Sequence, residues 1–421
     1  MYSSYWLTNV RLENGLVREN GAVAGTMTGL YSLKIANGKI AQIIPASGFS
    51  EKSATERNEA DNGLPVVDAH GLLALPSFVE KHCHLDKTWL GDRWRPVRPA
   101  HTIFERFDIE KDTLPKLGTT MKERAEVLLG SLLQAGSTHI RTHVDIYPDV
   151  GLRHLEAVKE ALSSFEGKLS YEIVAFPQHG LLRSHSVELV REALRQGCGL
   201  VGGVDPHTVD GDMERSLQGM MELAVEANAD VDLHLHDGGR IGLDTIKRLA
   251  ALTEEAGWQG RVAVSHAFAL GDMEGSEADE IAELLAENGI TVITSVPIGR
   301  VIPPVPFLQA NRVPVAIGCD NIFDSWSPFG NGDILERAAR LAERFGRSTE
   351  SALAETIGLI TGGRKPLDEQ GRQVWPQPGD EADMVFAEAS CSAEAVARRA
   401  RRPAVMNKGM IVAGSLERGS R

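Results

Sequence analysis

The sequence has few cysteines, few aromatic residues and no long apolar run. Its 421 residues include 4 cysteines and 5% aromatic residues. The cysteines form no C-x-x-C pair, which argues against a disulfide framework and against a cysteine-based zinc knuckle. We therefore expect a cytoplasmic protein whose thiols stay reduced.

The absence of long apolar runs also bears on membranes. No stretch approaches the roughly 18 residues that a membrane-spanning helix needs, so we expect no membrane association. Residues 1–6 have neither the basic nor the apolar segment of a signal peptide, and we expect none.

Basic residues are in the minority, with 44 Lys and Arg against 58 Asp and Glu and a net charge of −14. This balance argues against a nucleic-acid surface, for which a basic patch is expected. The remaining composition, 42% hydrophobic and 24% charged, excludes disorder and is ordinary for an α/β protein.

Both ends of the chain read as short strands joined by turns. Asn-Gly at 14–15 and 37–38, and Asn-Lys-Gly at 407–409, predict tight turns. The polar stretch 50–63 predicts an exposed loop. We expect one small β-sandwich-like domain built from residues 1–70 and 370–421, with strands at 6–12, 31–35, 39–44, 383–386, 404–406 and 410–413.

The middle of the chain, residues 71–369, alternates between strand-like and helix-like stretches. Eight apolar, β-branched runs, most of them separated by helix-period segments, predict a (β/α)8 barrel. An open doubly wound sheet is the alternative, but no G-x-G-x-x-G follows the first strand. The runs are 72–79, 138–144, 170–175, 200–204, 231–235, 261–264, 290–296 and 313–317.

Histidines gather at the carboxyl ends of these runs, which meet at one mouth of a barrel. Because residues two apart on a strand point the same way, His82 and His84 can bind one metal ion. With His234 and Asp320 they make three imidazoles and a carboxylate, which leave one position open for water. His266 is then placed to move a proton.

Each of these residues also has a structural interpretation. His143 and His179 alone are typical of hydrogen-bonded site or core histidines. Asp320 alone could be a turn or cap residue. The joint occurrence of the ligand types at the ends of strands one, five and eight, with His266 at the end of strand six, favours the metal site.

Several motifs resemble the amidohydrolase superfamily, in particular its cytosine-deaminase-like branch and the triazine-degrading members of that branch. They occur in the family's order and span almost the whole chain. They are PSFVEKHCHLDK (76–87), RTHVD (141–145), VAFPQ (174–178), VGGVDP (201–206), DLHLHD (232–237), SHA (265–267) and DNIFDSW (320–326).

The resemblance implies one divalent ion per chain, Zn or Fe, held by His82, His84, His234 and Asp320. It implies that His266 orients or deprotonates the metal-bound water, with Asp320 sharing the proton. It also implies that Gln178 hydrogen-bonds the substrate ring. The fourth run contains no lysine of the kind that binuclear members carbamylate, so we expect a single metal.

One departure concerns the general acid. Cytosine deaminases carry glutamate three residues after the fifth-strand histidine, where this chain has Asp237. We expect His236 to be the acid, as in the triazine-degrading relatives, with Asp237 orienting it. The alternative is that Asp237 is the acid and His236 a structural neighbour.

Further side chains near the mouth are candidates for substrate contacts. Trp89 or Trp326 could stack on a flat ring. Lys87, Asp205 and Asn321 are assigned polar contacts with the substrate.

The predicted reaction is therefore hydrolysis of an exocyclic C–N bond of a small N-heterocycle, such as an aminopyrimidine or s-triazine, by metal-bound hydroxide. Deamination and dealkylamination are not separated. Two alternatives are a cyclic-amide hydrolase and a catalytically silent barrel with a binding role. The resemblance also implies a homo-oligomer.

Overall fold

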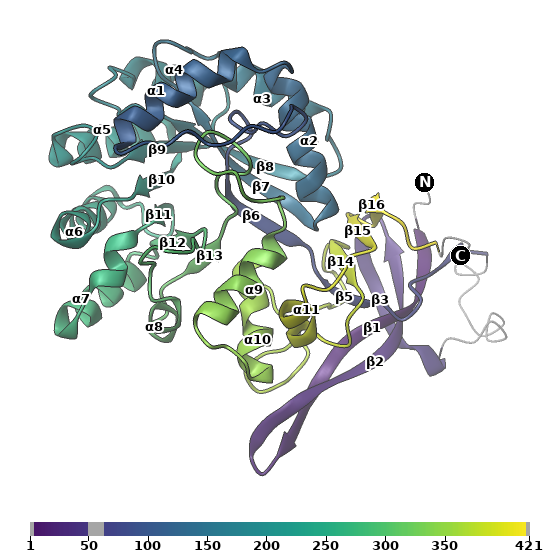
Figure 1. The fold of residues 1–421 in the computed structure, drawn as a ribbon. Coiled ribbons are helices and arrows are strands. Elements are labelled where there is room, and N and C mark those ends of the chain that lie inside the picture. The colour runs from purple at the N-terminus through teal and green to yellow at the C-terminus, as the bar shows by residue number, and fades with distance from the viewer. Residues whose placement is uncertain (1–3, 49–62, 418–421) are drawn as a thin grey trace.

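The computed structural model of the protein describes residues 4–48 and 63–417. The start of the N-terminal segment and nearly all of the loop predicted at 50–63 lie outside these residues. A barrel with surrounding helices occupies the middle of the chain, and a second sheet brings both ends of the chain together (Figure 1). None of the described helices is both long and apolar enough to span a bilayer.

Eight parallel strands within residues 63–417 form the barrel, and their spatial order follows the chain. After the last strand, the backbone N–H of Asp320 donates to the carbonyl of His82 in the first strand at 2.7 Å, which closes the sheet. The strands are β6 (Phe78–Cys83), β7 (Ser137–Asp145), β8 (Ser170–Phe176), β9 (Leu200–Val204), β10 (Asp230–Leu235), β11 (Val262–His266), β12 (Thr291–Thr294) and β13 (Val315–Ile317).

Helices cover the outside of the barrel, and one large apolar core fills the space between them and the strands. Apolar side chains on one face of each helix meet the outward-facing apolar side chains of the buried strands, as is typical of a parallel sheet covered by helices. The helices are α1 (Ile103–Thr113), α2 (Met121–Gln134), α3 (Arg153–Ser163), α4 (Val187–Arg195), α5 (Met213–Ala227), α6 (Gly239–Ala256), α7 (Gly275–Glu287), α8 (Val305–Ala310), α9 (Ile334–Arg344), α10 (Glu350–Thr356) and α11 (Ser392–Arg398).

The second sheet, mostly antiparallel, has its own smaller apolar core. Strands from the two ends of the chain lie side by side in it, in purple and yellow (Figure 1). It contains β1 (Ser4–Glu19), β2 (Ala22–Ala36), β3 (Lys39–Pro45), β4 (Val66–Asp68), β5 (Leu73–Pro76), β14 (Met384–Ala387), β15 (Ala404–Asn407) and β16 (Met410–Gly414). The predicted fold class, a (β/α)8 barrel with a small β-domain from both termini, is confirmed; the boundaries at 70 and 370 stay a prediction.

Two local predictions were wrong. The single strand predicted at 72–79 is divided after Pro76, with β5 in the second sheet and β6 in the barrel. The turn predicted at Asn14-Gly15 is instead a register shift inside β1, and the chain reverses at Asn20-Gly21. Both residues of that turn have positive φ, 51° and 83°, the conformation that Asn and Gly adopt most readily.

Candidate active site

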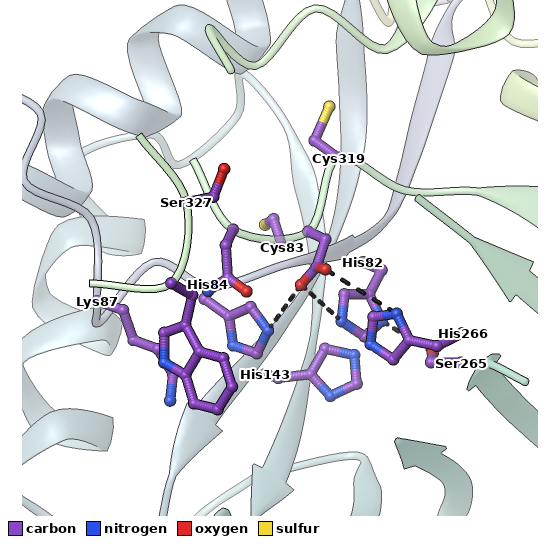
Figure 2. A network of polar contacts seen from close by, with 12 residues as sticks. His82, Cys83, His84, Lys87, His143, Ser265, His266, Cys319 and Ser327 are labelled. Carbon is purple, nitrogen blue, oxygen red and sulfur yellow. Dashed lines mark hydrogen bonds and ion pairs between the residues drawn. The ribbon is translucent and has the colours of Figure 1, made fainter. Parts of the chain in front are cut away.

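The predicted metal-binding side chains converge at the carboxyl ends of the barrel strands. His82 and His84 point their Nε2 atoms at the same Asp320 oxygen, at 3.5 and 3.4 Å (Figure 2). The ring of His234, from β10, lies 4.5 Å from the His82 ring. Cys83, between the two histidines on β6, directs its sulfur away, toward the Arg141 carbonyl.

Close backbone packing places His82 at this point. A Cβ on Gly318, just after β13, would lie 2.4 Å from the His82 Cβ, so only glycine lets the last strand approach the first. Asp320 follows with φ of 62°, a left-handed conformation that non-glycine residues adopt mainly where the fold requires it.

The imidazoles fit a metal ion because their ligating nitrogens have no other partner. Among the described residues, His82 Nε2 and both ring nitrogens of His234 are buried without a hydrogen bond. Such buried, unpaired groups are costly unless a ligand satisfies them. The donor set of neutral imidazole and carboxylate is one that Zn or Fe binds.

A chain of hydrogen bonds behind His82 sets its tautomer. Ser265 Oγ donates its proton to Asp232 Oδ1 at 2.7 Å. Ser265 Oγ therefore accepts the hydrogen bond from His82 Nδ1, which lies 2.8 Å away. The proton is therefore on Nδ1 and the lone pair of Nε2 faces the site. Arg141 holds the other Asp232 oxygen at 2.8 Å. Ser265, Asp232 and Arg141 lie within the motifs quoted above, but none of them was predicted to have a role in the site.

Electrostatics keep the cluster in its ligating form. Burial lowers the pKa of His84 and lowers that of His234 well below its usual value, so both rings are neutral. Burial alone would raise the pKa of Asp320, but the facing imidazoles of His266, His82 and His84 hold it well below its usual value. A neutral ring and an ionised carboxylate are the forms that bind metal.

His143, interpreted from the sequence as a hydrogen-bonded site or core histidine, also belongs to this cluster. Its ring lies 4.0 Å from that of His82 and 4.4 Å from that of His234, and the three could hold an ion together. Neither of its ring nitrogens has a hydrogen bond among the described residues, which differs from the expected hydrogen-bonded role.

His236 and His266 lie beside the cluster and stack on each other, with ring centroids 4.4 Å apart. His266 Nδ1 is 3.9 Å from the second Asp320 oxygen. His236 Nδ1 lies 2.8 Å from Asp205, which also accepts the backbone N–H groups of His236 and Asp237. Burial lowers the pKa of His236, but the Asp205 carboxylate outweighs this and raises it.

The structure corrects the roles expected of Asp237 and Asp205. The Asp237 side chain turns to Thr208, bonding its hydroxyl and its backbone N–H, so it does not orient His236. Asp205, expected to contact substrate, is only 2% exposed and orients His236 instead. The His236 ring is therefore held by Asp205, which directly follows β9, and not by Asp237, its neighbour in the chain.

Lys87 and Gln178 belong to a buried group that we call the Lys87 cluster, with Glu110 and Asp145. Lys87 Nζ donates to Asp145 at 2.7 Å, to Glu110 at 3.2 Å and to the Gln178 oxygen. Gln178 Nε2 donates to Glu110 at 2.6 Å. Lys87 is 1% exposed, so the expected contact with substrate is replaced by contacts within the protein.

Two remaining candidates line the space next to the metal cluster, together with Gln178. Asn321 donates to Asp324 at 2.6 Å, and Trp326 donates its indole N–H to Glu110. Trp89, the other stacking candidate, is 2% exposed and packs on Phe323 outside this space. Glu110, on α1, was not predicted, because nothing in the helix sequence distinguishes it from a solvent-facing residue.

The model of the family described as "Amidohydrolase family" matches residues 177–414, more than half of the chain. The chain belongs to the amidohydrolase family. This confirms the resemblance read from the motifs, and the amidohydrolase is accordingly a hydrolase of C–N bonds.

Relatives place this amidohydrolase in the cytosine-deaminase-like branch. N-isopropylammelide isopropyl amidohydrolase of Pseudomonas sp. (strain ADP) is 32% identical over 82% of this chain and 87% of its own length. The structure of N-isopropylammelide isopropylaminohydrolase from Burkholderia multivorans has a TM-score of 0.85 at 32% identity, over 99% of both chains. That of 5-methylcytosine deaminase from Klebsiella pneumoniae, liganded with phosphonocytosine, has a TM-score of 0.78 at 26% identity, over 99% of both chains.

Proposed function

We propose that this amidohydrolase hydrolyses an exocyclic C–N bond of a small N-heterocycle, such as an aminopyrimidine or s-triazine, and releases ammonia or an amine. The observation that carries the proposal is the convergence of His82, His84, His234 and Asp320 beside the stacked pair of His236 and His266. The names of the similar N-isopropylammelide hydrolases and 5-methylcytosine deaminase support the choice of ring.

The proposed cofactor is one divalent ion per chain, zinc or iron, held by His82, His84, His234 and Asp320. When bound, such an ion activates a water molecule as the nucleophile at neutral pH. Its fit rests on the unpaired nitrogens of His82 and His234 and on the ionised Asp320.

Proton transfer is assigned to three side chains. Asp320 and His266, 3.9 Å apart, take the proton of the attacking water. His236 gives a proton to the departing nitrogen, because its Nδ1 is held by Asp205 and its other nitrogen is left for substrate. Asp205 acts here as a positioning residue.

Substrate contacts are assigned to the residues that line the space beside the cluster. Trp326 offers a flat face on which a heterocycle stacks, and Asn321 offers amide atoms. Gln178 presents an amide that the Lys87 cluster holds in one orientation. These contacts position the ring so that its C–N carbon faces the activated water.

Two other functions rank below this one. A cyclic-amide hydrolase of the two-metal kind would use a lysine at the fourth strand, and β9 consists of Leu-Val-Gly-Gly-Val. A catalytically silent barrel would be expected to lack a ligand, whereas the four ligand side chains come together here. We further propose a cytoplasmic homo-oligomer; the four free, buried cysteines fit a reducing compartment.

The deciding experiment is to purify the protein with added Zn or Fe(II) and measure metal per chain by elemental analysis. The same preparation is assayed for ammonia and amine release from pyrimidines, pterins and triazines. We expect about one metal per chain, lost in His82→Ala, together with turnover of one of these rings. An intact protein that binds no metal would contradict the mechanism.

A further inference from the structure

A cleft of about 1090 Å³ leads from the metal site toward solvent. Its inner end is formed by His236, His266 and Asp320. Its wall carries four arginines from three parts of the chain: Arg106 on α1, Arg300 in the segment after β12, and Arg337 and Arg340 on α9. The proposed mechanism uses none of these four side chains.

These guanidinium groups make no direct ion pair within the part of the chain that the structure describes. Among the described residues, none of the four has a carboxylate oxygen within 4.0 Å. The side-chain hydrogen bonds of Arg106 and Arg337 go to backbone carbonyls, those of Arg98 and Ser325 and that of Ser295. Arg248, outside the cleft, shows the opposite arrangement and pairs with two glutamates.

The carboxylates of the cleft do not balance this charge. Asp320 belongs to the proposed metal site, and Asp333 is paired with Arg402. Glu336 is the remaining carboxylate that lines the cleft among the described residues, and it lies one helical turn before Arg340 on α9, without an ion pair to it. Glu110 and Asp324 act on Arg106 from behind the cleft wall, also without an ion pair. Positions three apart on a helix are neighbours, so Arg337 and Arg340 repel each other unless an anion lies between or near them.

The surroundings of the cleft arginines favour binding of an anionic group. The chain carries a net charge of −14, so the molecule as a whole repels anions at a distance, whereas a local group of arginines inside a cleft attracts them. Arginine also matches carboxylate and phosphate oxygens through a planar fork of donors. The Arg300 guanidinium lies 5.6 Å from the Phe268 ring, which gives the cleft an apolar side along which a carbon linker can pass.

We infer that the substrate is an N-heterocycle that carries an anionic substituent, a carboxylate or a phosphate, and that this group is bound by the cleft arginines. The inference rests on the proposed function, because the ring must occupy the space beside the metal site. It adds what that function leaves open, which is the chemical character of the group attached to the ring. A neutral ring would occupy the inner site and leave the arginines without an anion.

The test compares two probes that share one ring, ammelide and its N-carboxymethyl derivative, by isothermal titration of the metal-loaded protein. We expect the carboxymethyl compound to bind at least about tenfold more tightly, and more weakly as salt is raised. In Arg300→Gln/Arg340→Gln this preference should fall to about twofold, with ammelide binding unchanged. The single variant Arg300→Gln, at an exposed position, should show a preference between those of the wild type and the double variant. Arg195→Gln, at an exposed position on α4, should show the preference of the wild type.

The outcomes separate this inference from the proposed function. Equal affinity of the wild type for both probes would overturn the inference and leave the hydrolase proposal intact. If neither ring compound binds, the proposed ring is wrong, and inorganic phosphate is titrated into the same proteins. Phosphate binding that weakens at least about fivefold in the double variant would support the cleft as an anion site. Equal phosphate affinity in the wild type and the double variant, or no phosphate binding, would overturn the inference.

Discussion

Two groups of buried polar side chains lie next to each other at the mouth of the barrel and differ in how their atoms are satisfied. In the metal cluster, ring nitrogens of His82 and His234 have no partner among the described residues. In the Lys87 cluster, Lys87 makes three hydrogen bonds, and both ends of the Gln178 amide are bonded. Phe176 separates them, stacked on His234 and 5.6 Å from Lys87 Nζ.

The difference indicates what each cluster is for. Unpaired buried nitrogens cost stability, so a group of them is retained for what it binds. A fully bonded cluster contributes to stability and fixes the side chains around it, here Gln178 and Trp326. Removing a member of the first should affect function most, and removing a member of the second should affect folding most.

The largest effect is expected for His234→Ala. Turnover should fall by about 10⁴-fold or more, because a ligand to the ion that activates water is lost. The bound metal should fall in parallel, measured by elemental analysis. His139→Ala provides the control, since His139 lies near the amino end of β7, away from the site at the carboxyl ends of the strands, and its ring bonds Ser170. Full metal content and activity in His234→Ala would contradict the ligand assignment.

Lys87→Met should affect folding most strongly, by about 3–5 kcal/mol, because Glu110 and Asp145 are left buried without their cation. The measurement is the urea midpoint of the metal-loaded protein. Lys111→Met removes a partly exposed pair with Asp149 and should cost less than about 1 kcal/mol. Equal losses in the two variants would show that the Lys87 cluster contributes no special stability.

A smaller effect tests how His236, beside the metal cluster, is held in place. Asp205→Asn should lower kcat by about 100-fold and change the pH-rate profile, because His236 loses the carboxylate that holds its Nδ1 proton. Asp237→Asn should lower kcat by less than about threefold, since the Asp237 side chain bonds Thr208. The reverse order would restore Asp237 as the catalytic carboxylate.

The smallest effect concerns Asp324, a buried carboxylate that accepts from Asn321 and from the backbone N–H of Trp326, two residues that line the space beside the metal cluster. Burial raises its pKa to about 7. The folded state then holds this proton more tightly than the unfolded state, so stability should fall as pH rises from about 4 to 7. We expect about 1 kcal/mol between pH 5.5 and 6.5, measured by urea unfolding, and a flatter profile in Asp324→Asn.

The barrel and most of the proposed metal ligands were predicted from two sequence patterns: the alternation of side chains along a strand and the position of the histidines at the strand ends. His82 and His84 were expected to share a face because they are two apart on a strand, and both meet Asp320. The eight apolar runs predicted the barrel because parallel strands are buried on both faces. The division of the run at 72–79 was not visible, because the apolar residues on both sides of Pro76-Ser77 are buried and follow each other as they would in one strand.

Contacts that join distant segments were beyond sequence reasoning. Glu110 joins Lys87, Gln178 and Trp326 only because α1 folds over the mouth of the barrel. Asp205, and not Asp237, contacts the His236 ring because β9 ends beside the end of β10. That placement depends on the register between the two strands. No local pattern distinguishes such residues from ordinary charged positions.

The closing contact of the barrel has a consequence for the order of events during synthesis. His82 lies on the first barrel strand and Asp320 follows the last one, and their backbones meet at 2.7 Å. An ion held by both would tie together segments separated by more than two hundred residues. A chain that has not yet emerged as far as Asp320 cannot assemble the ligand set, so uptake of the ion would mark the completion of the barrel rather than begin it.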